Sequence, residues 1–236
     1  MDRILALDTS SDCCSVGLSF SGQQTSITNR TPRQHSQKLL VMVEEVLADA
    51  GITVNQLDAI AFGRGPGSFT GIRICLSVAQ GLAYAADIPL IPVSTLRTIA
   101  QGTLRQGRIL PQQNLLVAVD ARMQEVYWAD YRVQFDGAVI PLGEESISPP
   151  EIVSEHVFTG GLKGENLVIA GSGLIYAEIS GMACAHQFTD SQIDSCDMLT
   201  LVHSDPENHL PIEPHLAQPV YLRDSVAWKK RQRIRS

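Results

Sequence analysis

The sequence predicts an α/β protein with two lobes, because the same order of elements occurs in each half of the chain. Residues 4–20 (ILALDTSSDCCSVGLSF) read as an apolar strand, an aspartate, a polar turn and a second strand, and residues 115–131 (LLVAVDARMQEVYWADY) repeat that order. A strand, a glycine turn and a helix follow in both halves, at 57–86 and 166–179. We therefore expect an N-terminal lobe over residues 1–107 and a C-terminal lobe over residues 108–236.

This order resembles the actin-like ATPase (ribonuclease H-like) folds, in which each of two lobes begins with a strand, an aspartate and a hairpin. In that class, duplicated βαβ lobes enclose a cleft, and the two aspartate turns face each other across the nucleotide phosphates. The candidates to line such a cleft here are Asp8, Thr9, Ser10, Asp120, Gly171 and Gly173. Against nucleotide hydrolysis, the turn LDTSSDCCSV contains no glycine that would let its backbone N–H groups approach a phosphate.

In chain order, apolar runs and turn residues predict the strands of the first lobe at 4–10, 14–20, 23–29, 57–62 and 89–93. Helices are predicted at 35–50, at 70–86, and from Ser94 or Thr95 to about residue 106, followed by a connection between the lobes at 107–113. In the second lobe we expect a helix capped by Ser148, a strand at 166–170, and helices near 174–179 and 197–203. Prolines favour a loop over 209–220, and 221–223 is expected to form an edge strand.

Residues 63–86 (GRGPGSFTGIRICLSVAQGLAYAA) form a glycine-rich turn that opens an apolar helix. The turn has no lysine, so it is not the phosphate loop GxxxxGK[ST], and its glycines are not spaced as in GxGxxG. Ser68 or Thr70 is expected to cap the helix. Two interpretations stay open: the N–H groups of the first helical turn hold an anion or a neighbouring chain, or the glycines only let the helix start close to the strand.

Both helices of the first lobe that flank this turn are more apolar than one core requires. Residues 74–86 contain no charged residue, and the helix at 35–50 is apolar at 40–42 as well as on its inward stripe. We therefore predict one continuous surface on these two helices that docks against another chain. Its candidate residues are Leu40, Val41, Met42, Gly67, Ser68, Phe69, Ile72, Arg73, Leu76, Ala79 and Ala83.

The charge of the chain is uneven. The net charge is −7, yet the last nine residues (WKKRQRIRS) hold five cations and no acid. An acidic body with a short basic tail is not typical of a protein that binds nucleic acid by itself. The tail is either a solvated chain end or a contact for RNA or an acidic partner, through Lys229, Lys230, Arg231, Arg233 and Arg235.

Composition predicts a reducing, cytoplasmic location. The five cysteines lack CxxC spacing and read as reduced thiols that fill the core. No run of 18 apolar residues is free of polar interruption, and the first residues (MDRILALDTSS) lack the layout of a signal peptide. We expect no membrane partner.

Protease and metal chemistry lack their usual motifs. The GxSxG elbow is absent, and no two of the six histidines are spaced to share one helix face. One alternative is a metal site built from residues distant in sequence. Another is a catalytic pair of Cys13 or Cys14 with a distant histidine, but thiols that only pack in the core are favoured over such a pair. The remaining enzymatic alternative is a weak ATPase that uses Asp8 and Asp120 as its carboxylates.

Three segments carry a specific resemblance: GPGSFTGIR at 65–73, DARMQEVYWA at 120–129 and PVYLRDSVAWKK at 219–230. They resemble the TsaB (YeaZ) family of bacterial tRNA threonylcarbamoyladenosine biosynthesis proteins, which older descriptions call glycoprotease-like, and the resemblance extends from LDTS at 7–10 to the C-terminal segment. It implies an actin-like fold and work with a catalytic paralogue, TsaD, and a small ATPase, TsaE. Together these proteins move a threonylcarbamoyl group from an adenylate donor onto the adenosine 3′ of the anticodon in ANN-decoding tRNAs.

The resemblance implies a non-catalytic partner rather than the transferase. The catalytic paralogue binds its metal with two histidines one helical turn apart after the proline-valine strand, and residues 93–98 (VSTLRT) contain no histidine. We therefore expect a homodimer when the chain is alone, binding to TsaD-like and TsaE-like proteins in a complex, and indirect contact with tRNA. The chain itself is expected to need no metal and no cofactor, with weak ATP or ADP binding in the complex as a possibility.

Overall fold

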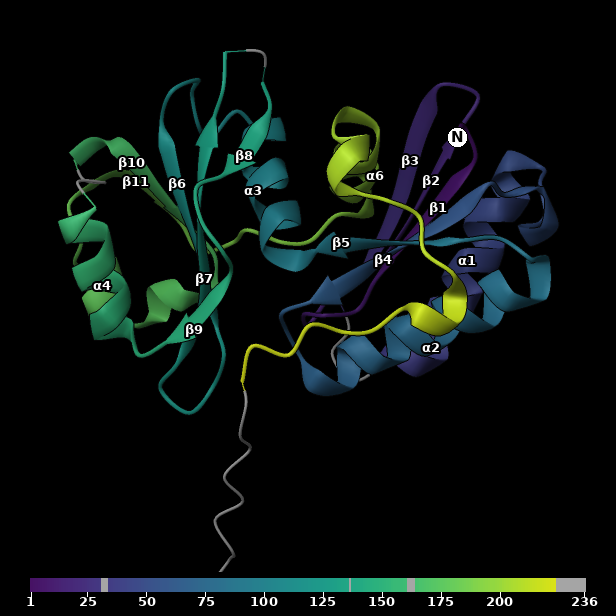
Figure 1. Ribbon diagram of the computed structural model, residues 1–236, viewed down its shortest axis with the longest axis horizontal. Coiled ribbons are helices and arrows are strands. Elements are labelled where there is room, and N and C mark those ends of the chain that lie inside the picture. The colour runs from purple at the N-terminus through teal and green to yellow at the C-terminus, as the bar shows by residue number, and fades with distance from the viewer. Residues whose placement is uncertain (31–33, 136, 161–163, 224–236) are drawn as a thin grey trace, which may run out of the picture.

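The computed structural model describes residues 1–30, 34–135, 137–160 and 164–223, and it forms two lobes, each built around one mixed sheet (Figure 1). The strands of the first sheet are β1 (Ile4–Asp8), β2 (Cys14–Phe20), β3 (Gln23–Asn29), β4 (Ala59–Gly65) and β5 (Leu90–Ser94). Those of the second are β6 (Asn114–Asp120), β7 (Val126–Val133), β8 (Val139–Pro141), β10 (Gly164–Ala170) and β11 (Cys184–Phe188). A short strand, β9 (Ser146–Ser148), pairs with β7.

The two sheets have the same topology. The first runs β3-β2-β1-β4-β5 and the second, read from its other edge, β8-β7-β6-β10-β11. In each, the opening strand pairs antiparallel with the next strand and parallel with the fourth. The duplication predicted from the two aspartate hairpins is therefore confirmed, and the fold is the two-lobed actin-like α/β type.

Most helices lie where periodicity predicts them: α1 (His35–Ala50), α2 (Phe69–Ala86), α3 (Thr95–Arg105), α4 (Pro150–Thr159) and α6 (Ser195–Ser204). Two local predictions are wrong, and a third is only partly right. Pro149, not Ser148, precedes α4 as its cap residue. The expected helix at 174–179 is a 3₁₀ turn (Ser172–Ile175) followed by the short α5 (Ala177–Ser180). Residues 221–223 form no strand.

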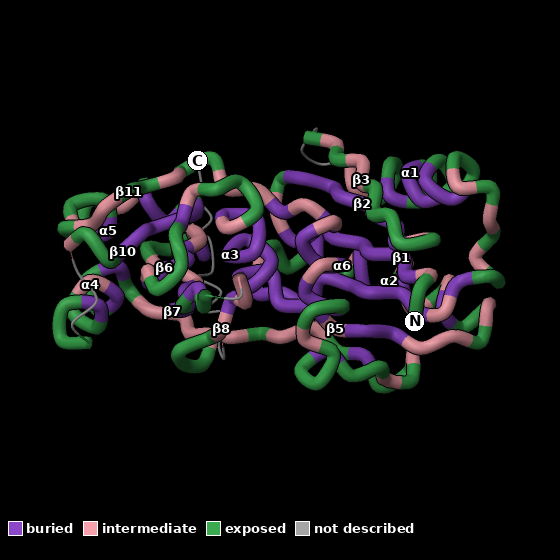
Figure 2. The backbone as a smooth tube through the Cα atoms, turned by 90° about the horizontal axis from the view of Figure 1, so that it is seen from above, coloured by how far each residue is buried: buried purple, intermediate pink, exposed green. Residues whose placement is uncertain are grey.

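Helices cover the first sheet on both faces. On one side, α1 and α2 pack on alternate strand residues such as Leu5, Leu7 and Phe62. On the other, α6 packs Met198 and Leu199 against the remaining set, which includes Ile4, Ala6, Ala59 and Val93. Alternation of strand side chains between two apolar layers explains why β1 and β4 are almost continuously apolar. Figure 2 shows the central strands of both sheets as buried.

The lobes exchange one helix each. Helix α3 follows β5 of the first sheet, yet Leu96, Ile99 and Ala100 pack against the second sheet. Helix α6 follows β11 of the second sheet and packs on the first. The two exchanged helices lie side by side between the sheets (Figure 1) and are joined by ion pairs, Arg105 to Asp197 at 2.7 Å and Arg97 to Asp205 at 2.6 Å.

This exchange corrects the predicted lobe boundaries. The chain crosses to the second sheet between β5 and α3, before the connection expected at 107–113, and it returns before α6. After α6 it stays on the first lobe, since Ile212 pairs with Leu90 and the Val220 N–H donates to the Arg64 carbonyl at 2.8 Å. Residues 195–220 therefore pack with the first lobe rather than with residues 108–194.

Helix α2 is long and apolar enough to span a membrane by length and composition, with a mean hydropathy of 1.2. Such a helix is also typical of a protein core. Here Ile72, Cys75, Leu76, Ala79 and Ala83 form one buried stripe against the sheet. The five cysteines are free, and burial raises the pKa of the Cys14 thiol to about 12, as expected for a core thiol.

Candidate functional site

The first aspartate turn is closed by the chain itself. Asp8 is buried, and its Oδ1 accepts hydrogen bonds from the Ser10 N–H and the Ser10 hydroxyl, both at 2.8 Å. Burial raises the pKa of the Asp8 carboxyl to about 6, against these two hydrogen bonds, which lower it. Gly63 of β4 passes directly beside the carboxyl, and a Cβ at this position would overlap Asp8 Oδ2.

The glycine-rich turn covers the other two residues of this hairpin tip. The Thr9 hydroxyl donates to the Gly71 carbonyl at 2.7 Å, and the Ser68 N–H donates to the Ser10 carbonyl at 2.7 Å. A Cβ on Gly67 or Gly71 would overlap the Ser10 or Thr9 carbonyl oxygen. These glycines therefore serve a close approach within the chain, to the first aspartate turn rather than to the preceding strand.

The same contacts argue against a phosphate site at this tip. The Ser10 N–H is bonded to Asp8, the Ser68 N–H is bonded to Ser10, and the Thr95 hydroxyl donates to the Ser10 hydroxyl at 3.0 Å. Ser68 caps α2 by accepting from the Gly71 N–H, as predicted. Three of the polar groups at this tip that could face a nucleotide phosphate are thus already paired within the chain.

The second aspartate turn is organised differently. Asp120 Oδ1 accepts from the Tyr176 hydroxyl at 2.8 Å and from the Arg122 N–H at 2.9 Å. Gly171 and Gly173, the other predicted cleft residues, both press against Ala118 of β6, where a Cβ would overlap backbone or side-chain atoms. They too are explained by packing.

Across residues 1–30, 34–135, 137–160 and 164–223, no group of three His, Cys, Asp or Glu side chains could hold a metal ion.

Five of the predicted interface residues face inward, so this part of the prediction is wrong. Met42, Ile72, Leu76, Ala79 and Ala83 are all buried in the core of the first lobe. Their stripe is the side of each helix that packs on the sheet, and a helix apolar all round does not reveal by periodicity which side that is. Gly67 is half-buried and lies against Ser10.

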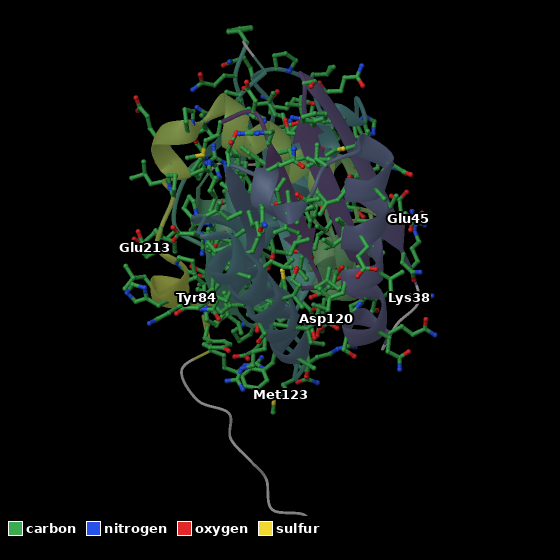
Figure 3. All side chains as sticks on the ribbon, turned by 90° about the vertical axis from the view of Figure 1, so that its right-hand side faces the viewer. Lys38, Glu45, Tyr84, Asp120, Met123 and Glu213 are labelled. Carbon is green, nitrogen blue, oxygen red and sulfur yellow. The ribbon has the colours of Figure 1, made fainter. Side chains whose placement is uncertain are left out.

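Four other predicted interface residues lie on the outward side of α1 and α2. Leu40 and Val41 on α1 and Phe69 on α2 are each about half exposed, and Arg73 is exposed beside them. Tyr84 is 83% exposed on the same outward side of α2, and the prediction missed it. The spacing of residues 70, 73, 77, 81 and 84 on one helix face would have identified it. In Figure 3, Lys38 and Glu45 of α1 lie at one edge of the molecule and Tyr84 of α2 lies toward the opposite edge.

A shallow groove of about 470 Å³ lies between the first turns of the two helices. It is lined by Ser36, Phe69, Thr70, Arg73, Ile74, Ser77 and Val78. The Arg73 guanidinium lies 3.8 Å from the Phe69 ring centre, and Arg73 Nε donates to the Tyr221 hydroxyl at 2.9 Å. An apolar groove with one cation at its end can receive side chains of another protein.

The predicted tRNA contacts lie outside the described residues: Lys229, Lys230, Arg231, Arg233 and Arg235.

Comparison with known proteins gives one consistent result. The family model for TsaD, tRNA N6-adenosine threonylcarbamoyltransferase, matches residues 26–196. The tRNA threonylcarbamoyladenosine biosynthesis proteins TsaB of Escherichia coli and Haemophilus influenzae are 38% and 36% identical to this chain, over 97% and 96% of both sequences respectively. The solved structure of YeaZ from Pseudomonas aeruginosa is 38% identical and superposes with a TM-score of 0.84, over 94% of this chain and 100% of that one.

These similarities cover both lobes and the exchanged helices, and they agree with the motifs at 65–73 and 120–129. We conclude that the chain belongs to the TsaB (YeaZ) family of tRNA threonylcarbamoyladenosine biosynthesis proteins, which share the TsaD-type domain.

Proposed function

We propose that this chain is a non-catalytic binding subunit for tRNA threonylcarbamoylation, and that it docks a TsaD-like catalytic paralogue on the outward side of α1 and α2. The family has its role in this biosynthesis. The observation that carries the docking role is the outward side of α2, which bears one cation, Arg73, and no acid between Phe69 and Ala86.

Gly81 supports a close approach by another helix. It lies in the middle of α2 on the exposed side, where glycine costs about 1 kcal/mol relative to alanine. A Cβ at this position would meet nothing within 4 Å in the chain, so internal packing does not require the glycine. Ser77, Gly81 and Ala85 follow one another at four-residue intervals, and small residues at this spacing let two helices pack closely.

The charges of the helix pair support a partner of the same shape. The two helices begin at the same end of the lobe, since Ser36 lines a groove with Phe69, and the exposed cations Lys38 and Arg73 lie near that end. The exposed acids Glu44, Glu45 and Asp49 lie toward the other end of α1. A two-fold axis perpendicular to the helices would set the cationic end of one copy against the acidic end of the next. We therefore propose a homodimer when the chain is alone, and competition for the same surface by the paralogue.

The catalytic and nucleotide-dependent steps are assigned to the partners. Residues 93–98 contain no histidine pair, and the Asp8 turn is closed by Gly67, Ser68 and Gly71. We propose that the chain needs no cofactor of its own, that a TsaE-like ATPase joins the complex, and that the tail from Lys229 to Arg235 contacts tRNA there. The site of action is the cytoplasm, where tRNA is modified.

The purified chain, incubated with tRNA, ATP, threonine and bicarbonate, should yield no modified adenosine. Modification should appear once the TsaD-like, TsaE-like and adenylate-forming partners are added. Threonylcarbamoylation by the chain alone would overturn the proposal. The alternative, a weak ATPase of the actin-like fold, predicts phosphate release that is lost in Asp8→Ala, and we expect equal background rates for both proteins.

A further inference from the structure

The turn between β6 and β7 has an unusual backbone. Arg122, Met123 and Gln124 have φ angles of 64°, 57° and 60°, so three consecutive residues with side chains adopt the left-handed conformation. Residues other than glycine visit this region rarely, and then usually one at a time. Such a conformation persists only where the surroundings determine it, and it is found preferentially at functional sites.

Bonds from two parts of the chain hold this turn. Within the hairpin, the Ala121 N–H donates to the Glu125 carbonyl at 2.9 Å and the Glu125 N–H to the Arg122 carbonyl at 3.1 Å. From the C-terminal segment, Arg223 donates to the Ala121 and Arg122 carbonyls at 3.2 and 3.3 Å and pairs with the Glu125 carboxylate. Arg223 is thus a positioning residue for the turn.

The turn so held presents its side chains to solvent. Met123 is 65% exposed, and its sulfur accepts a hydrogen bond from Arg223 at 3.6 Å. The side chain of Arg122 is 81% exposed. A flexible thioether held in solvent on a strained turn is a feature of binding surfaces, since methionine adapts its shape to an apolar partner.

The turn is continuous with the outward side of α2. The Phe69 and Tyr221 rings lie 5.5 Å apart, and Arg73 donates to the Tyr221 hydroxyl. Tyr221 and Arg223 are two residues apart, which spans about 7 Å at most. Figure 1 shows the β6–β7 turn and α2 at the same lower edge of the molecule, and Figure 3 labels Met123 at that lower edge.

We propose that the partner surface extends across both lobes, from α2 over Tyr221 to the turn at 122–124, and that the partner's contribution there is a protein segment with apolar and acidic side chains. Phe69 and Met123 offer apolar contact. The guanidinium groups of Arg73 and Arg122 stay exposed to a partner's carboxylates, and that of Arg122 also pairs with Asp120 at 3.3 Å within the chain. A protein is favoured over RNA because the adjoining side of α2 is apolar and nearly uncharged. This inference rests on the proposed docking role of α1 and α2.

The test measures the dissociation constant of the full chain for the TsaD-like paralogue by calorimetry. Met123→Asp should weaken binding at least tenfold. Phe135→Asp is the matched control, because Phe135 is 82% exposed on another hairpin of the second lobe, and it should change binding less than twofold. Arg223→Ala should also weaken binding, whereas Arg108→Ala, which removes a similar pair with Asp190, should not.

A rescue separates positioning from a general loss of stability. Glycine adopts the left-handed conformation freely, so adding Gln124→Gly to Arg223→Ala should restore most of the affinity. Val41→Glu on α1 tests the proposed function independently. If Val41→Glu abolishes binding while Met123→Asp leaves the dissociation constant unchanged, the extension to the second lobe is wrong and the docking role stands. If Met123→Asp alters only tRNA affinity and its salt dependence, the protein partner at this turn is likewise wrong.

Discussion

Arg105 of α3 pairs with the buried Asp197 of α6, with 2.7 Å between Arg105 Nε and Asp197 Oδ1, and this contact joins the two exchanged helices. Burial raises the pKa of Asp197, whereas the guanidinium opposes this rise. Because the carboxylate side chain is fully buried, it depends on Arg105 for its charge compensation.

Arg105→Ala should therefore destabilise the chain by about 3 kcal/mol, since it leaves a buried carboxylate without its partner. Arg108→Ala, which removes a pair with the exposed Asp190, should cost less than about 1 kcal/mol. Urea unfolding of both variants measures the difference. Equal losses would show that the contact between α3 and α6 contributes no more than a surface pair.

Asp8 should make stability depend on pH in the direction opposite to that of a salt-bridged aspartate. Its folded pKa, about 6, lies above the ordinary value of 3.8, so the folded state binds more protons between these values. The contribution of Asp8 to the free energy of unfolding is then fully present below about pH 4. It falls by up to about 3 kcal/mol as pH rises to about 6. Asp8→Asn should remove this slope. Unfolding curves of both proteins from pH 4 to 8 test it, and a difference between them that does not vary with pH would contradict the account.

Two glycines of α2 should respond to alanine in opposite ways. Gly71→Ala should unfold or strongly destabilise the chain, because the new Cβ would overlap the Thr9 carbonyl. Gly81→Ala should stabilise it by about 1 kcal/mol, since its Cβ meets nothing and alanine favours the helix. The same Gly81→Ala variant should bind the paralogue more weakly. A stabilised variant with unchanged affinity would remove Gly81 from the proposed contact.

Deleting residues 228–236 should weaken tRNA binding by the assembled complex and flatten its salt dependence. Each duplex phosphate that the complex no longer neutralises reduces the slope of log K against log salt by about 0.9. Affinity for the paralogue should not change. Titrations of tRNA at several salt concentrations compare the two complexes, and an unaltered slope would leave the tail as a solvated end.

Local patterns predicted the fold well. Apolar runs and turn residues placed β2, β3 and α1 with the bounds that the structure has, because these elements are set by nearby residues. The duplicated sheets could be predicted because Asp8 and Asp120 mark the same hairpin twice. The exchange of α3 and α6 could not, since the choice of sheet depends on contacts that are remote in sequence, such as Met198 with Ile4.

The site was predicted only in part. The apolar composition of α2 indicated that one side packs on the sheet and another side packs on a second chain. The sequence did not show that Ala79 and Ala83 face the sheet while Tyr84 faces outward. The left-handed turn at 122–124 was missed because Arg-Met-Gln lacks the glycine or asparagine that usually marks this conformation.

The central claim is that the outward side of α1 and α2 binds another chain, and Val41→Glu tests it most directly. Val41 is 54% exposed, so a glutamate there should leave the fold intact, unlike one at Met42 or Ala79, which are buried. Ile152→Glu on α4, at an apolar residue of similar exposure, is the control.

Light scattering should find the Val41→Glu chain monomeric, with a circular dichroism spectrum that matches the parent, and calorimetry should detect no binding to the TsaD-like paralogue. The Ile152→Glu chain should remain dimeric and competent to bind. A folded Val41→Glu chain that is still dimeric and binds the paralogue with parental affinity would contradict the account.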